Sequence, residues 1–126
     1  MLIVEDHPIF RRGLVQLISG EPGLAVAGEA AGVAKATELF IAEAPDLVLV
    51  DLSLADGEGV DLIRELKRRD PEVKLLVITS YAHTATADSA LAAGAVEVLD
   101  KAAPAEVLLG AIRKALNTVG IDSSSE

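Results

Sequence analysis

The chain has 126 residues, 51% of them hydrophobic, which suits one compact domain with a single core. Eleven basic against 20 acidic residues give a formal net charge of −9, which disfavours direct binding to nucleic acid or anionic membranes. The absence of cysteine excludes disulfides and thiolate metal sites, and no apolar stretch reaches the roughly 18 residues of a membrane span. With no basic segment of a signal peptide at its start, we expect a soluble, cytoplasmic protein that does not act at a membrane.

Short apolar runs alternate along the chain with segments of helical spacing. The runs lack period-two alternation, which indicates strands that are buried on both faces. We expect strands at 2–4, 24–28, 46–51, 74–80 and 96–99. Apolar residues with helical spacing follow each of them, over 10–18, 36–43, 62–66, 87–91 and 107–116.

Proline and glycine fall where these helices should begin and end. Pro8 and Pro104 suit first helical turns, Pro71 follows the third helix, and the expected stops are Gly20, Gly94 and Gly120. Five strand and helix pairs of this length predict an α/β fold: a doubly wound, five-stranded parallel sheet with helices on both faces. The flavodoxin-like strand order 2-1-3-4-5 is the common solution at this size.

Polar residues lie at the carboxyl ends of four expected strands. Glu5 and Asp6 follow the first, Asp51 ends the third, Thr79 ends the fourth and Lys101 follows the fifth. In an open parallel sheet these ends form one rim, and ligands bind where the strand order reverses. We therefore expect the five side chains to converge.

Three carboxylates at one point repel one another unless a cation lies among them. An all-oxygen acidic pocket suits a hard divalent ion such as Mg²⁺. The hydroxyl and the ammonium on the same rim offer a donor and a positive charge to the oxygens of a transferred phosphoryl group.

The segments "VEDHP", "LVLVDLSLADGEGVDLI", "VITSY" and "GAVEVLDK" resemble the receiver domain of two-component response regulators, a CheY-like domain. Thr79 and Lys101 lie 28 and 50 residues beyond Asp51, a spacing similar to that of the NarL/FixJ (LuxR-type) branch. "EDHP" followed by "RRGL" resembles the same branch. The resemblance implies that Thr79 follows the phosphoryl group and that Lys101 pairs with it.

The resemblance also implies that Asp51 accepts a phosphoryl group from a sensor histidine kinase. Mg²⁺ would lie between the carboxylates of Asp6 and Asp51 and the backbone carbonyl of Ser53, with Glu5 contributing through water. Such a protein is a signalling phosphoacceptor and not an enzyme.

For the domain organisation we expect a receiver domain over 1–120 and a linker or tail over 121–126. The resemblance implies a downstream helix-turn-helix output domain, absent from this chain, through which DNA would be bound. Phosphorylation would then control a partner or a homodimer interface around the fourth helix, fifth strand and fifth helix. The alternative is a stand-alone receiver that acts as a phosphoryl relay or interaction module without DNA binding.

Four positions depart from the family pattern. Ala55 replaces a common proline, and Val98 stands where a tyrosine or phenylalanine is usual. Asp100 occupies a position that is apolar in the branch, and Ala102 replaces the proline of the Lys-Pro subfamilies. The changes at Val98 and Asp100 bear on the readout and leave the rim carboxylates intact.

Other interpretations fit less well. A dehalogenase-type phosphatase needs a second acid two residues after its nucleophile, where this chain has Ser53. A nucleotide-binding domain needs a glycine-rich loop after the first strand, which "EDHPIFRRG" lacks. His7, before Pro8 at a helix start, is more typical of a cap or surface residue than of a metal ligand, and His83 is typical of a loop.

Overall fold

A computed structural model describes residues 1–54, 57–80 and 85–121. Five parallel strands form one sheet in the order β2-β1-β3-β6-β7. Their bounds are Leu2–Val4 for β1, Gly28–Ala30 for β2, Leu47–Asp51 for β3, Lys74–Thr79 for β6 and Glu97–Asp100 for β7. The helices are Pro8–Ser19 (α1), Val33–Glu43 (α2), Gly59–Arg69 (α3), Ala85–Ala93 (α4) and Ala105–Ile121 (α5).

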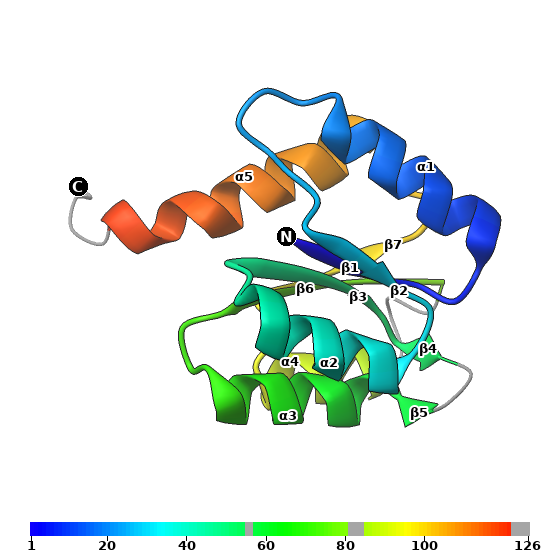
Figure 1. Cartoon of the computed structure of the whole chain (residues 1–126), viewed down its shortest axis with the longest axis vertical. Helices are drawn as coiled ribbons and strands as arrows, with labels where there is room; N and C mark the ends of the chain where they lie inside the picture. The colour runs from blue at the N-terminus through cyan, green and yellow to red at the C-terminus, as the bar shows by residue number, and fades with distance from the viewer. Residues whose placement is uncertain (55–56, 81–84, 122–126) are drawn as a thin grey trace.

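The helices form a layer on each face of the sheet. Figure 1 shows α1 and α5 on one face and α2, α3 and α4 on the other. In chain order the observed strands follow 2-1-3-4-5, so the predicted flavodoxin-like α/β fold is confirmed. None of the described helices is long and apolar enough to cross a membrane.

Each face of the sheet has its own apolar core, because successive strand residues point to opposite sides. In β3, Val48 and Val50 pack in the cluster beneath α2 and α3, whereas Leu47 and Leu49 pack in the cluster beneath α1 and α5. All four side chains are fully buried. β3 therefore has no solvent-facing side, which explains its continuous apolar sequence and fixes the position of Asp51 at its end.

Most of the predicted helix boundaries are confirmed. His7 is the N-cap of α1, where its Nδ1 accepts a hydrogen bond from the Phe10 backbone N–H at 3.3 Å, and Pro8 follows as the first helical residue. Gly20 caps the C-terminus of α1, and Gly94 follows α4 with a φ of +125°, a backbone conformation that glycine favours. The predicted stop at Gly120 is wrong, because α5 includes Ile121, the last residue that the structure describes.

Two features of the sheet differ from the sequence prediction. β2 covers Gly28–Ala30 instead of 24–28, and Leu24 and Val26 pack against the core from the segment before it. An antiparallel pair of short strands, β4 (Ser53–Leu54) and β5 (Gly57–Glu58), was not predicted. It lies between β3 and α3, at the lower right of Figure 1.

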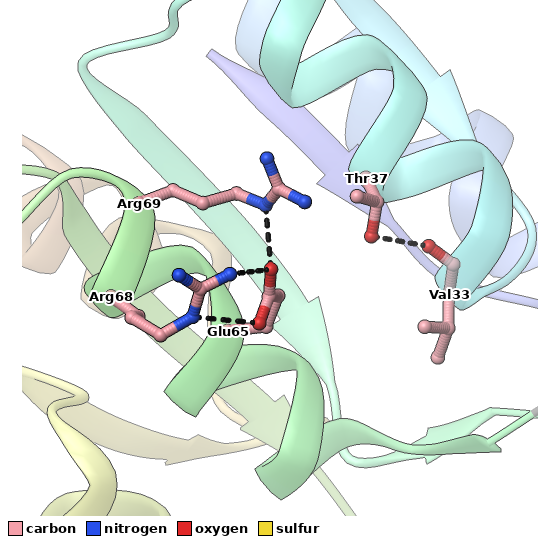
Figure 2. Close-up of polar contacts among 5 residues, drawn as sticks. All are labelled: Val33, Thr37, Glu65, Arg68 and Arg69. Atoms are coloured by element: carbon pink, nitrogen blue, oxygen red, sulfur yellow. Dashed lines mark hydrogen bonds and ion pairs between the residues drawn. The ribbon is translucent and has the colours of Figure 1, made fainter.

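The outer face of α3 carries ion pairs within the helix. Figure 2 shows Glu65 accepting hydrogen bonds from Arg68 and Arg69, the shortest at 2.7 Å from each arginine. On α2 the Thr37 hydroxyl donates to the Val33 carbonyl at 3.0 Å. The hydrogen bond from Arg68 is the main reason that the pKa of Glu65 lies below its ordinary value. Solvent screens exposed ion pairs of this kind, so they add little to the stability of the fold.

Candidate functional site

Three carboxylates meet at the carboxyl ends of β1 and β3. Oxygen atoms of Glu5, Asp6 and Asp51 lie within 4.8 Å of one another. Glu5 is fully buried and Asp51 is 3% exposed, while Asp6 is half-buried. The backbone N–H of Glu5 donates to Ala30 at 2.9 Å and so extends the contact between β1 and β2 to the rim. The predicted convergence of the acidic residues is thus observed.

Lys101, in the loop after β7, points into this cluster. Its Nζ lies 3.0 Å from Glu5 Oε1 and 3.1 Å from Asp51 Oδ2, and it donates to Glu5 Oε2 at 3.1 Å. The Phe10 ring lies on another side of the ammonium, with its centroid 4.8 Å from Nζ. This cation–π contact was not predicted, because an apolar residue in the first turn of α1 carries no sequence signal for it.

Arg11 fixes the loop that carries the acidic pair. Its Nη1 donates to the Glu5 carbonyl at 2.8 Å, and its Nε lies 3.2 Å from Glu29 Oε1 on β2. The His7 backbone N–H donates to Glu5 Oε2 at 3.0 Å. Arg11 was missed by the sequence analysis, although its place four residues after His7, inside the "RRGL" segment, could have directed attention to it.

The electrostatics of the cluster leave an excess of negative charge. Burial is the main cause that raises the pKa of Glu5, and the Asp51 charge adds to it, against the hydrogen bonds from His7 and Lys101. Burial lowers the pKa of Lys101, but its hydrogen bonds to Glu5 and Asp51 outweigh that effect and raise the pKa above its ordinary value. One ammonium thus faces three carboxylates, and an all-oxygen donor set with unbalanced charge fits Mg²⁺.

Thr79 lies at the same rim. It is the last residue of β6 and 1% exposed, and in the neighbouring strand Asp51 is paired with Ile78, one residue before it. Its carbonyl accepts a hydrogen bond from the Lys101 backbone N–H at 3.0 Å. The structure therefore brings Glu5, Asp6, Asp51, Thr79 and Lys101 to one edge of the sheet.

The remaining predictions about site residues have different outcomes. Ser53 begins β4 directly after the site, and a metal-binding role for its carbonyl stays a prediction. Ala55 and His83 lie outside the described residues. Val98 is partly buried against the core beneath α2 to α4, and Asp100 makes hydrogen bonds in the loop that carries Lys101.

Gly59 was also missed by the sequence analysis. A Cβ at this first residue of α3 would lie 2.6 Å from Leu52 Cα and 2.8 Å from the Asp51 carbonyl oxygen. The Gly59 N–H donates to the Leu52 carbonyl at 3.1 Å. The start of α3 therefore packs directly on the backbone that holds Asp51, which only glycine permits.

Comparisons with known proteins show the family of the chain. The family model of the response regulator receiver domain matches residues 1–113. The DNA-binding transcriptional activator DevR/DosR of Mycobacterium tuberculosis is 41% identical over 95 residues, which cover 75% of this chain and 44% of the relative. The response regulator protein VraR of Staphylococcus aureus is 34% identical over 118 residues, 90% of this chain and 54% of the relative.

A solved structure of a response regulator has the same fold as this chain. The two-component response regulator of the LuxR family from Aurantimonas sp. SI85-9A1 superposes with a TM-score of 0.86 at 35% identity, over 91% of this chain and 82% of that chain. The chain spans about half the length of the curated relatives that it matches. It belongs to the response regulator receiver domain family, in its NarL/LuxR branch.

Proposed function

We propose that this chain is a phosphoacceptor domain that takes a phosphoryl group on Asp51 from a sensor histidine kinase. The observation that carries the proposal is the position of Asp51. Its nearly buried carboxylate ends the central strand β3, lies 3.1 Å from the Lys101 ammonium and shares a cluster with Glu5 and Asp6. A nucleophile, a positive charge and a set of metal ligands are the parts that phosphoryl transfer needs.

In the transfer, a carboxylate oxygen of Asp51 attacks phosphorus, and the bond between phosphorus and the kinase histidine nitrogen breaks. The product is an acyl phosphate on Asp51, and the imidazole leaves with the bonding electron pair. Asp6, Asp51 and the Ser53 carbonyl would hold Mg²⁺, with Glu5 contributing through water. The ion supplies positive charge that offsets the charge on the phosphoryl oxygens.

Two further side chains act on the new group. The Lys101 ammonium leaves Asp51 Oδ2 and pairs with a phosphoryl oxygen, a small movement because Lys101 already lies in the pocket. The Thr79 hydroxyl, one residue beyond the partner of Asp51 on β6, donates to another phosphoryl oxygen. Movement of Thr79 then changes the face formed by α4, β7 and α5, which controls a partner or a homodimer.

The proposed output is transcriptional regulation in the cytoplasm, through a helix-turn-helix domain that follows the receiver domain of residues 1–120. The relatives support this proposal, since DevR/DosR is a DNA-binding transcriptional activator and this chain matches 44% of it. The net charge of −9 argues against DNA binding by the receiver domain itself.

The test is phosphorylation with a small phosphodonor. Acetyl phosphate and Mg²⁺ should add one phosphoryl group, measured as a mass increase of the intact protein, and Asp51→Asn should abolish it. Asp61→Asn is the matched control, because Asp61 is an exposed carboxylate on α3 that pairs with Arg64 at 3.0 Å. Unchanged labelling of Asp51→Asn would contradict the assignment.

A further inference from the structure

The loop after β7 is held by three hydrogen bonds around Lys101. The Asp100 carboxylate accepts from the Ala102 N–H at 2.8 Å, and the Asp100 carbonyl accepts from the Ala103 N–H at 3.0 Å. On the other side, the Lys101 N–H donates to the Thr79 carbonyl at 3.0 Å. The backbone on both sides of Lys101 is therefore fixed, and its side chain leaves the loop in the direction of Glu5 and Asp51.

The hydrogen bond from Ala102 needs two residue types at once. An aspartate or asparagine at position 100 supplies the side-chain oxygen that closes this turn, and an apolar residue cannot. Position 102 must supply a backbone N–H, which proline lacks. Asp100 and Ala102, two positions at which the chain departs from the family pattern, thus form one matched pair.

We propose that Asp100 is a positioning residue for Lys101, acting through the N–H of Ala102. The inference rests on the proposed phosphoacceptor function. Lys101 must keep its ammonium within about 3 Å of the carboxylates and then of the phosphoryl oxygens, so a shift of its backbone moves the charge away from the reacting atoms. The turn at Asp100 restricts that shift.

The chain contains a matched turn far from the site. Asp70 Oδ1 accepts from the Glu72 N–H at 2.9 Å, two residues on, as Asp100 accepts from Ala102. Asp70 follows α3 and precedes β6, so it lies at the opposite edge of the sheet from Lys101. Removing the two carboxylates therefore deletes the same kind of hydrogen bond, once beside the site and once away from it.

The experiment measures the rate of phosphorylation by acetyl phosphate at saturating Mg²⁺ for Asp100→Ala, Asp100→Asn and Asp70→Ala. We expect Asp100→Ala to react about tenfold more slowly, since small misplacements of a charge at a reacting centre have effects of this order. Asp100→Asn should react at close to the wild-type rate, because its amide oxygen still accepts the hydrogen bond. Asp70→Ala should react at the wild-type rate, although both alanine variants should melt at a similarly lowered temperature.

A second measurement does not depend on phosphorylation. The Lys101 side-chain protons lie near the Phe10 ring, so their NMR signals should carry a ring-current shift, lost in Asp100→Ala and kept in Asp100→Asn and Asp70→Ala. The inference fails if Asp100→Ala reacts at the wild-type rate, if Asp100→Asn reacts as slowly as Asp100→Ala, or if Asp70→Ala is equally slow. If the wild-type protein takes up no phosphoryl group, the proposed function is wrong. The positioning role of Asp100 is then decided by the NMR measurement alone, and a ring-current shift that is retained in Asp100→Ala overturns it.

Discussion

Lys101 brings one positive charge to a rim that holds the carboxylates of Glu5, Asp6 and Asp51. Asp6 is the most accessible of the three, whereas Glu5 and Asp51 share the lysine ammonium. Asp6 and Asp51 would therefore hold a divalent cation, with Asp6 as the ligand that is open to solvent. The three acids differ in burial and in ion pairs, which leads to separate predictions for Asp6 and Glu5.

Asp6→Ala should weaken Mg²⁺ binding by about tenfold or more, because the ion prefers carboxylate oxygens and this change removes the accessible one. At a Mg²⁺ concentration 100 times the dissociation constant, the wild-type protein should gain about 2.7 kcal/mol of stability from the ion. This gain should be visible as a higher melting temperature. Calorimetric titration measures the affinity directly. Asp61→Ala removes an equal charge from an exposed site and should bind Mg²⁺ as the wild type does. Equal affinity in Asp6→Ala would count against the pocket.

The effect of burial on the Glu5 carboxylate can be tested by comparing how the free energy of unfolding of Glu5→Gln and of the wild type depends on pH. Burial holds the pKa of Glu5 above its ordinary value of 4.5, so the folded protein binds this proton more tightly than the unfolded chain does. The stability gained from that proton is present below pH 4.5 and is lost as the pH rises through the folded pKa. In the presence of EDTA, the free energy of unfolding of Glu5→Gln should therefore increase relative to wild type as the pH rises through this range.

Urea unfolding at a series of pH values provides the measurement for Glu5→Gln. Saturating Mg²⁺ should reduce or reverse the trend, because the ion favours the charged carboxylate. The free energy of unfolding of the variant relative to the wild type could instead stay constant with pH or fall as the pH rises. Either result would show that burial does not govern the pKa of Glu5.

The charged residues that gather at the rim were predicted from the sequence. The residues that contact them and fix their positions were missed. The carboxyl ends of parallel strands share one edge, so Asp51, Thr79 and Lys101 could be placed together from their positions at the ends of predicted strands. Phe10 and Arg11 could not be assigned, because their contacts with Lys101 and Glu5 depend on the path of the loop between β1 and α1.

Helix α3 begins directly against the backbone that carries Asp51. Gly59→Ala should destabilise the fold by about 1 to 3 kcal/mol, because its Cβ would lie 2.6 to 2.9 Å from three backbone atoms of Asp51 and Leu52, which cannot move independently of β3. Gly110→Ala in α5 is the matched control. Apart from its chain neighbours and the backbone of its own helix, no atom of the described residues lies within 4 Å of a Cβ at Gly110, so alanine should stabilise that helix by about 0.5 to 1 kcal/mol. Denaturant midpoints measure both, and a stabilised Gly59→Ala would contradict the close approach.

The elements that could not be predicted share a physical cause. β2 is an edge strand with only β1 as a neighbour, and its residues Gly28–Ala30 include one exposed side chain, so they form no apolar run. Leu24 and Val26 formed the more apolar segment, but they are buried by packing and not by strand pairing. The strands β4 and β5 have two residues each, too few for periodicity. The central strands were predicted because burial on both faces leaves a continuous apolar run. The five helices were predicted because burial along one side leaves apolar residues at helical spacing.

In the proposed function, the whole molecule would carry its chemistry at one edge of the sheet and its readout on the face formed by α4, β7 and α5. A phosphoryl group on Asp51 would add further negative charge to a protein with a net charge of −9, and Mg²⁺ and Lys101 would offset that charge. In that proposal the change would pass from Thr79 on β6 to β7, where Thr79 is paired with Asp100. Val98 of β7 lines a groove between α4 and β7 together with Ala87, Leu91 and Val96.

We predict that phosphorylation proceeds normally while the change on the α4, β7 and α5 face is shallower than in receivers with an aromatic residue at this position. Valine is too small to swing inward and follow the Thr79 hydroxyl, whereas Val98→Tyr places a ring beside the groove and strengthens the coupling. A gain of about 1 kcal/mol would raise the ratio of active to inactive conformers roughly fivefold. Backbone amide shifts of Ala85–Ala93 and Glu97–Asp100 on adding beryllofluoride measure the change, and acetyl phosphate labelling should be equal in both proteins. If beryllofluoride already produced large, saturating shifts in the wild type and Val98→Tyr did not enlarge them, residue 98 would not limit the readout.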